Sequence, residues 1–156
     1  MQTPLSANKK PGTLFRKLIK KLGCSFTPEF TPLETLYDWE EKRTLFRLEN
    51  SGFIILEYIN CVLHFKLTTK GIIESLLVTI FETKENLAEE QLCFISFDIP
   101  MVINSARKKL RQFLKKAGFK QIHQSLWATT KNIIQELEAI LEMFNYDEYI
   151  RIFVGK

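Results

Sequence analysis

The second half of the chain alternates between short strand-like runs and longer helical runs, and this order constrains the fold more than any other feature. Residues 92–97 form a nearly continuous apolar run, as expected of a buried central strand. From Ile103 to Ala117 apolar residues recur at helical spacing, and Gly118 suits the end of that helix. Residues 119–129 are strand-like again, either as one bent strand or as a short hairpin.

The same alternation continues to the end of the chain. Thr130 can cap a further helix with an apolar inner face, which comprises Ile133, Ile134, Leu137, Ile140, Leu141 and Phe144. Residues 149–154 predict a last strand, with Ile150, Ile152 and Val154 on its inner side. The order β-α-β-β-α-β predicts a ferredoxin-like domain over residues 91–156, with two helices on one face of a single sheet.

The first half predicts a different domain, over residues 12–81. It begins with an amphipathic helix stopped at Gly23 and a short helix over 33–39, followed by a helix over 40–51 with Leu45 and Leu48 inward and a cap at Gly52. Two strands, over 53–58 and 62–67, follow with a turn at Asn60 between them. Thr68 then caps a last helix. Helix, short helix, helix and hairpin follow one another in this way in a winged helix-turn-helix. Residues 82–90 are polar and acidic, which predicts a linker. The fold class is therefore α+β.

Basic residues gather in two segments of the chain. Residues 1–21 contain six Lys or Arg and no acid, and residues 106–120 contain seven and no acid. Because the whole chain carries a net charge of +4, all other residues together carry −9. Two basic segments on an otherwise acidic body indicate a polyanion-binding surface, although two solvated helix faces would give the same pattern.

The composition favours a protein of the cytoplasm without a membrane partner. No run of about 18 apolar residues is present, so no transmembrane helix is expected. The first 23 residues are too basic and too interrupted for a secretory signal. Cys24, Cys61 and Cys93 lie far apart in the sequence, which is typical of reduced thiols and not of a disulfide framework. With His64 and His123 they show no zinc-ligand spacing.

Several phrases carry a resemblance to a known family. Residues 45–54 (LFRLENSGFI) and 67–71 (LTTKG) resemble the end of the recognition helix and the exit from the wing in winged helices. Residues 97–100 (FDIP), two arginines on a helix, Gly118-Phe119 and residues 124–127 (QSLW) resemble the Cas-like ferredoxin domain of PaaX-type transcriptional repressors. Those repressors place a winged helix first and this domain second, as this chain does.

The resemblance implies a DNA-binding transcriptional regulator without a cofactor, which as a homodimer would bind double-stranded DNA at a palindromic operator. The candidate DNA-binding residues are Lys42, Arg43, Thr44, Arg47, Lys66, Arg107, Lys108, Arg111 and Lys115. The first four would lie on the recognition helix, whereas the last four belong to the second basic segment. The phenylacetate-type repressors have a further C-terminal domain, and this chain ends at Lys156. A small-molecule effector is therefore doubtful here.

Asp98 supports an alternative from another class of protein. The second domain also resembles the small CRISPR adaptation nuclease, in which an aspartate ends the first strand. That resemblance implies an endonuclease in which two copies of Asp98 share Mg²⁺ across a twofold axis, so that Asp98 is both the metal-binding and the catalytic residue. Alternatively, Asp98 only turns the chain before Pro100. The wing tip carries no Lys or Arg, and a winged helix that contacts protein instead of DNA is a further possibility.

Overall fold

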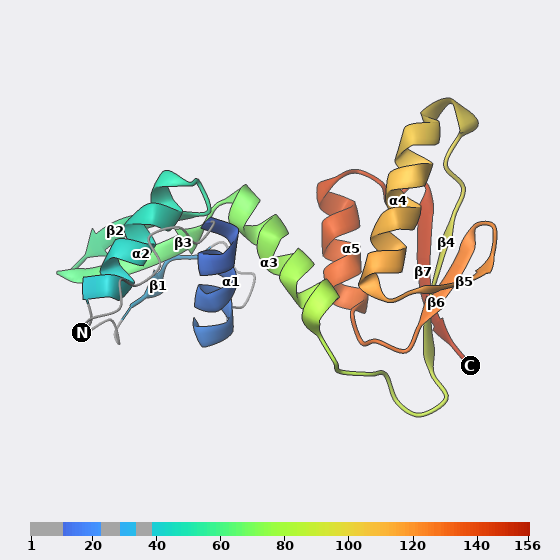
Figure 1. Cartoon of the computed structure of the whole chain (residues 1–156), viewed down its shortest axis with the longest axis horizontal. Coiled ribbons are helices and arrows are strands. Elements are labelled where there is room, and N and C mark those ends of the chain that lie inside the picture. The colour runs from blue at the N-terminus through green and yellow to red at the C-terminus, as the bar shows by residue number, and fades with distance from the viewer. Residues whose placement is uncertain (1–10, 23–28, 34–38) are drawn as a thin grey trace, which may run out of the picture. The chain divides into compact units, whose positions relative to one another are not determined.

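The structure is a computed structural model that describes residues 11–22, 29–33 and 39–156. The chain divides into unit 1, Met1–Ser75, and unit 2, Leu76–Lys156. The boundary lies inside helix α3, Thr69–Glu82, which begins in unit 1 and ends in unit 2 (Figure 1).

Unit 1 combines helices with a small antiparallel sheet. Its elements before α3 are α1 (Pro11–Leu22), β1 (Thr31–Pro32), α2 (Trp39–Asn50), β2 (Ile54–Ile59) and β3 (Val62–Leu67). The three strands lie in the order β1-β3-β2. The helix over 40–51 and the strand pair with its turn at Asn60 are thus confirmed. Strand β1 was not predicted, and residues 34–38 of the expected short helix lie outside the described residues.

The core of unit 1 joins α1, α2 and the sheet. Phe15 and Leu48 are fully buried, and Leu45 is nearly so, which confirms the two inward leucines of α2. Phe15 stacks on Phe53, with ring centroids 4.9 Å apart. The remaining buried apolar residues of this core are Leu18, Ile19, Leu33, Ile54, Phe65 and Leu67. Gly23, expected to stop the first helix, lies outside the described residues, as do the side chains of Leu14 and Leu22.

The ends of α2 and α3 meet around Phe53. Gly52 adopts the left-handed conformation (φ 75°), and the Phe53 N–H donates to the Leu48 carbonyl at 3.0 Å, which confirms the cap after α2. The Thr68 Oγ1 accepts a hydrogen bond from the Gly71 N–H at 3.1 Å, so Thr68 caps α3 as expected. The Thr68 N–H in turn donates to the Phe53 carbonyl at 3.1 Å.

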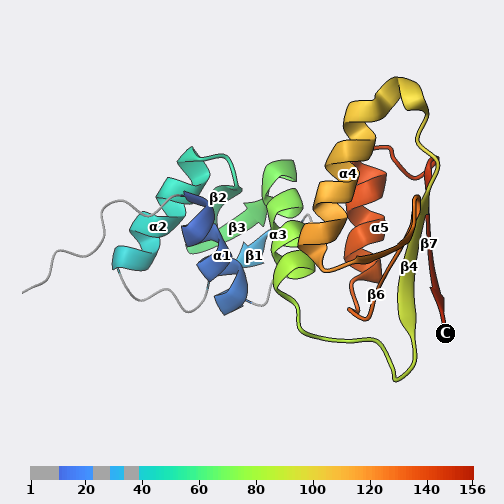
Figure 2. The same cartoon turned by 45° about the vertical axis from the view of Figure 1, so that its right-hand side comes forward.

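Unit 2 is a four-stranded antiparallel sheet with helices on one side. Its elements after α3 are β4 (Leu92–Phe97), the 3₁₀ helix η1 (Met101–Ile103), α4 (Asn104–Ala117), β5 (Lys120–His123), β6 (Leu126–Thr129), α5 (Ile134–Met143) and β7 (Ile150–Gly155). The strands lie in the order β5-β6-β4-β7. This is the arrangement expected for β-α-β-β-α-β, and residues 119–129 are a hairpin. Both views show α4 and α5 on the same side of this sheet (Figures 1 and 2).

The core of unit 2 lies between the sheet and its two helices. Cys93, Ile95 and Phe97 of β4 are buried there, together with Trp127 of β6 and Leu114 of α4. The other side of β4 is half-exposed at Leu92, Phe94 and Ser96. The predicted central strand is therefore confirmed, but only one of its faces is fully buried, because helices cover one face of this sheet only.

Two further details of unit 2 differ from the sequence prediction. The Thr130 Oγ1 donates to Asn86 Oδ1 at 3.0 Å, and α5 begins only after Ile133, so Thr130 does not cap it. Val154 lies on the same side of the sheet as the buried Cys93 but is exposed, because β7 is an edge strand.

Among the described residues, no helix has the length and apolar character needed to cross a bilayer.

Candidate nucleic-acid interface

Helix α2 presents basic residues on the side opposite its buried leucines. Lys42 and Arg43 are exposed, whereas Thr44 and Arg47 are half-buried. Leu45 and Leu48, three residues apart, fix the inner side of the helix. The outward position predicted for Lys42 and Arg43 is therefore confirmed. The Lys42 ammonium group and the Arg43 guanidinium group are both accessible to a ligand from solvent.

Lys66 lies on a different surface from these two residues. Its neighbours in β3, Phe65 and Leu67, point into the core, so Lys66 points to the outer face of the three-stranded sheet. There its Nζ lies 5.6 Å from the centroid of the Phe30 ring. The role predicted for Lys66 in DNA binding stays a prediction.

The turn between β2 and β3 carries no charged residue at its tip. Asn60 and Cys61 both have positive φ, 50° and 63°, as the two central residues of a tight hairpin turn require. Tyr58 beside this turn is 66 % exposed, and Val62 is exposed as well. The tip therefore offers no charge to a phosphate group.

Helix α4 carries the second basic group. Lys108 and Lys115 are exposed, whereas Arg107 and Arg111 are half-buried at the edge of the helix–sheet contact. One terminal nitrogen of Arg111 donates to the Gln124 carbonyl at 3.3 Å, which ties α4 to the turn between β5 and β6. The Nε atoms of both arginines are buried and have no hydrogen-bond partner among the described residues.

A long part of unit 2 around α4 contains no acidic residue. Between Asp98 and Glu136 the chain has eight Lys or Arg and neither Asp nor Glu. This segment includes η1, α4 and the β5–β6 hairpin. Lys116, near the end of α4, places its Nζ 4.5 Å from the centroid of the Phe81 ring. The positive charge of α4 is therefore not neutralised by acids of its own segment.

Asp98 follows β4 directly and is exposed. Its backbone N–H donates to the Tyr149 carbonyl at 2.9 Å, which holds the strand end in place. Within the described ranges, no group of three or more His, Cys, Asp or Glu side chains is placed to hold a metal ion. Asp98 therefore does not belong to such a group within one copy of the chain.

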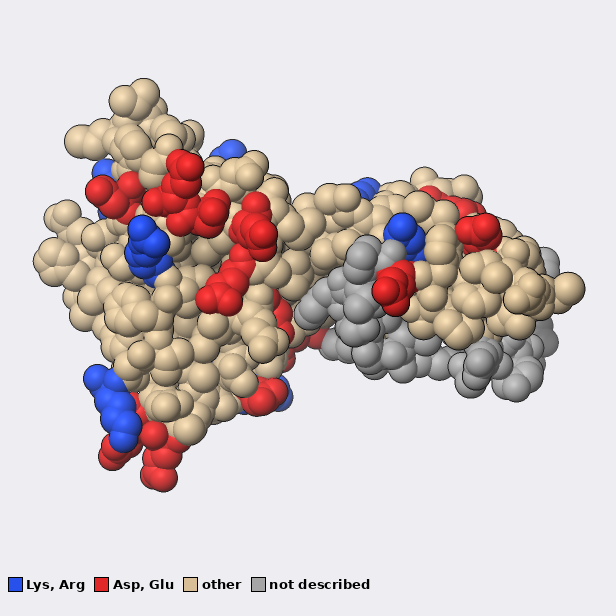
Figure 3. Space-filling view, turned by 180° about the vertical axis from the view of Figure 1, so that it is seen from behind, with Lys and Arg blue, Asp and Glu red and all other residues tan. Residues whose placement is uncertain are grey.

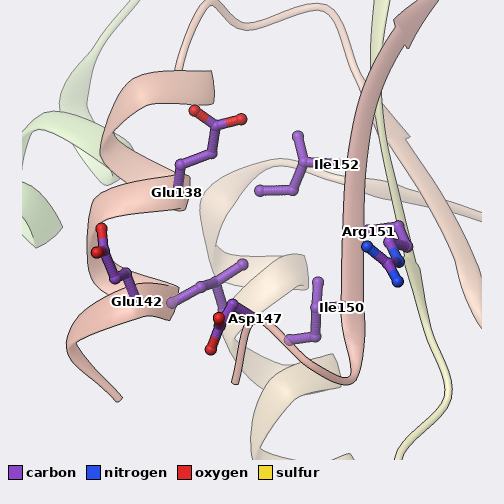
Figure 4. Close-up of a pocket in the computed structure, with 7 residues that line it drawn as sticks. Glu138, Glu142, Asp147, Ile150, Arg151 and Ile152 are labelled. Carbon is purple, nitrogen blue, oxygen red and sulfur yellow. The ribbon is translucent and has the colours of Figure 1, made fainter. Parts of the chain in front are cut away.

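A shallow pocket lies between α5 and β7. It has a volume of about 340 Å³, with Glu138, Glu142 and Asp147 at its rim and two isoleucines of β7 along one side (Figure 4). Arg151 also borders it, but Figure 4 shows its side chain on the other side of the strand. Acidic side chains gather on this region of unit 2 in the rear view (Figure 3). Such a rim disfavours a phosphate-bearing ligand.

Two apolar features were not predicted from the sequence. Phe94 and Phe153 stack on the open face of the sheet of unit 2, with ring centroids 5.2 Å apart and planes 10° from parallel. Their pairing across β4 and β7 follows from strand register, which requires the tertiary fold. The second feature is Met101 and Val102, which are 82 % and 97 % exposed. In the sequence, Met101 and Val102 only follow Pro100 as two apolar residues, and no helical or strand periodicity assigns either of them to a buried or an exposed side.

Unit 2 has the strand order of a ferredoxin-like domain, and a comparison with protein-family models found one match in this part of the chain. Residues 86–156 match the model described as the PaaX protein central Cas2-like domain. This match supports the PaaX-like regulator family for the chain. No curated protein matches it.

Proposed function

We propose that this protein is a DNA-binding transcriptional regulator of the PaaX-like type. The observation that carries the proposal is the match of residues 86–156 to the central domain of PaaX, placed after a domain of helices and a three-stranded sheet. In this proposal unit 1 is a winged helix with α2 as its recognition helix, and unit 2 mediates dimerisation and contacts the DNA backbone.

The arrangement of unit 1 favours a winged helix. Helices α1 and α2 pack against the three-stranded sheet. Two of its strands, β2 and β3, form a hairpin, and the third, β1, comes from the segment between the two helices. Arg43 on the outer side of α2 could contact guanine in the major groove, and a good bidentate contact discriminates between bases by about 1–3 kcal/mol. Lys42 and Arg47 would contact phosphates, which adds affinity without sequence preference.

The open face of the sheet in unit 2 favours a homodimer. Phe94 and Phe153 are stacked there, Phe153 is 47 % exposed, and Leu92 and Leu126 beside them are half-exposed. A contiguous apolar patch of this kind is typical of a protein contact. A symmetric dimer formed through this face would present two copies of α2 to a palindromic site.

Sedimentation of purified protein tests this dimer. We expect wild type to sediment as a dimer and Phe94→Ser with Phe153→Ser as a monomer. Ile55→Ser, which removes an exposed isoleucine of unit 1, is the matched control and should remain dimeric. If the double variant stays dimeric, the open sheet face is not the interface.

DNA binding by α2 is tested on a duplex selected by the wild-type protein from a random library. We expect Arg43→Ala with Arg47→Ala to weaken binding of that duplex at least about tenfold, as loss of a base contact and a phosphate contact requires. The control, Lys84→Ala with Lys156→Ala, removes the same charge from exposed positions elsewhere. Equal affinity of both double variants would refute the role of α2. Circular dichroism verifies that each variant is folded.

The exposed position of Asp98 at a strand end favours a second candidate, a metal-dependent endonuclease. In this candidate the second carboxylate comes from a partner copy, and the described residues contain no group of three or more His, Cys, Asp or Glu that could hold the metal alone. Incubation with duplex DNA or RNA and Mg²⁺ tests it. Cleavage that is lost in Asp98→Ala, and also in the variant at Phe94 and Phe153, would establish this candidate in place of the regulator.

A further inference from the structure

The turn that leads into α4 exposes three consecutive apolar side chains. Met101 and Val102 are almost fully exposed, and Ile103 is 39 % exposed; these three residues are called the apolar tip below. Pro100 precedes them, and the Ile103 N–H donates to its carbonyl at 2.9 Å. The proline ring and this hydrogen bond hold the tip in one short turn, η1, before any ligand binds.

The tip projects from one end of unit 2. In both cartoons the turn between β4 and α4 extends beyond the other loops at that end of the unit (Figures 1 and 2). No apolar surface of the unit covers Met101 or Val102, as their exposure shows. Exposed methionine and valine at a protruding position are unfavourable in water, and they indicate a contact with another molecule.

The charge behind the tip indicates the chemistry of that molecule. The basic residues of α4 begin with Arg107, four residues and therefore about 6 Å along the helix from Ile103. They continue to Lys115, about 12 Å further. The acid-free segment between Asp98 and Glu136 includes the tip and this helix. In duplex DNA, the stacked bases would suit the apolar tip and the phosphates would suit the row of cations on α4.

We propose that the apolar tip inserts into the minor groove of duplex DNA as a wedge between two base pairs. This inference rests on the proposed DNA-binding function but concerns a different surface from α2. Apolar side chains that enter a base step unstack it and bend the duplex, while neighbouring Arg and Lys hold the phosphates. Pyrimidine–purine steps such as TA open most easily and would be preferred. The protein would then bend its operator as well as read it.

Two other occupants fit the surface less well. A tip that enters a membrane needs its basic residues close to the tip, at the depth of the lipid headgroups. Here the row of cations runs about 12 Å further along α4. A protein partner would not require the segment from Ile99 to Gln135 to be free of acids. The exposed Asp98, Asp147 and Glu148 belong to the flanking loops and restrict a polyanion to the tip and α4.

The test uses the duplex selected by the wild-type protein, about 40 bp long, with a fluorophore on each end and a 2-aminopurine at its TA steps. We expect wild type to bend it by about 20–90°, seen as increased energy transfer, and to raise 2-aminopurine emission at one step. Met101→Ser with Val102→Ser should abolish both signals and weaken binding several-fold. Ile122→Ser, an exposed isoleucine of β5, is the control and should retain both.

The outcomes separate the wedge from the proposed function. Arg43→Ala with Arg47→Ala should weaken binding while the DNA that remains bound is still bent. Binding without a bend, or a bend that persists in the serine variant, overturns the wedge and leaves the regulator intact. Failure of wild type to select any duplex overturns both. Cosedimentation with vesicles of anionic phospholipid that depends on Met101 and Val102, with unchanged DNA bending in the serine variant, would assign the tip to a membrane surface.

Discussion

Replacement of Gly71 by alanine sets two physical effects against each other. Gly71 is the third residue of α3, and a helix favours alanine over glycine by about 1 kcal/mol. From the sequence alone, Gly71→Ala should therefore stabilise the protein. In the structure, however, a Cβ at this position would overlap the Phe53 carbonyl oxygen and lie 3.1 Å from its carbonyl carbon. These are backbone atoms, which cannot rotate away.

The surroundings of Phe53 determine the size of the effect. Its N–H is bonded to Leu48, its carbonyl accepts the Thr68 N–H, and its ring stacks on Phe15, so Phe53 cannot yield. Helix α3 must move instead. Overpacking of this kind costs about 1–3 kcal/mol, and loss of the Thr68 cap and its hydrogen bond costs roughly 1 kcal/mol each. After subtraction of the helical gain, we expect a net destabilisation of about 2–4 kcal/mol.

Urea unfolding measures this change. A Trp39→Phe background leaves Trp127 as the only tryptophan, so its fluorescence reports unit 2 while circular dichroism at 222 nm reports both units. Gly71→Ala should lower the midpoint of the transition of unit 1 and leave the transition of Trp127 nearly unchanged. Gly52→Ala is the matched control. It meets no atom within 4 Å but has φ 75°, so only its backbone strain of about 1–2 kcal/mol should appear. A neutral or stabilising Gly71→Ala would refute the close approach of α3 to Phe53.

Three further changes test other parts of the structure. Cys61→Gly should raise the free energy of unfolding of unit 1 by about 1 kcal/mol, because Cys61 has φ 63° in a tight turn; an unchanged urea midpoint would contradict that turn. Lys131→Met should lower the melting temperature of unit 2 by several degrees, since its Nζ donates to the Ile80 and Phe81 carbonyls at 3.4 and 3.5 Å near the end of α3 and contributes about 1 kcal/mol. Lys84→Met, at an exposed position, should leave the melting temperature of unit 2 unchanged. Burial raises the pKa of the Cys93 thiol from 9.0 to about 11, so between these pH values only the unfolded thiol ionises. Wild type should therefore lose up to about 2 kcal/mol relative to Cys93→Ala as pH rises through this range, and parallel losses in both proteins would contradict the burial of this thiol.

The local elements were predictable where their signals lay within a few residues. The β2–β3 hairpin followed from two alternating runs around Asn60, and α4 from apolar residues at helical spacing that end at Gly118, which has φ 92°. The N-cap at Thr68 was also correct. Thr130 offered the same residue type, but its hydroxyl bonds Asn86, 44 residues away, and no local pattern reports such a contact.

The candidate site was predictable in part for the same reason. The inward position predicted for Leu45 and Leu48 was enough to place the basic residues of α2 on the outer side of the helix without knowledge of the tertiary fold. Lys66 lies on the outer face of the sheet, as its alternation with Phe65 and Leu67 indicates, and its role in DNA binding stays a prediction. The tie between Arg111 and the β5–β6 turn depends on packing, and the apolar tip could be recognised only by its exposure.

The central proposal, a regulator that reads duplex DNA, is tested most directly by its specificity ratio. Affinities of the full chain for the selected duplex and for a scrambled duplex of equal length should be measured at the same physiological salt concentration. We predict that the selected duplex binds at least about 10³-fold more tightly, as is typical of specific recognition. Equal affinity for both duplexes, or no binding to either, would contradict the account.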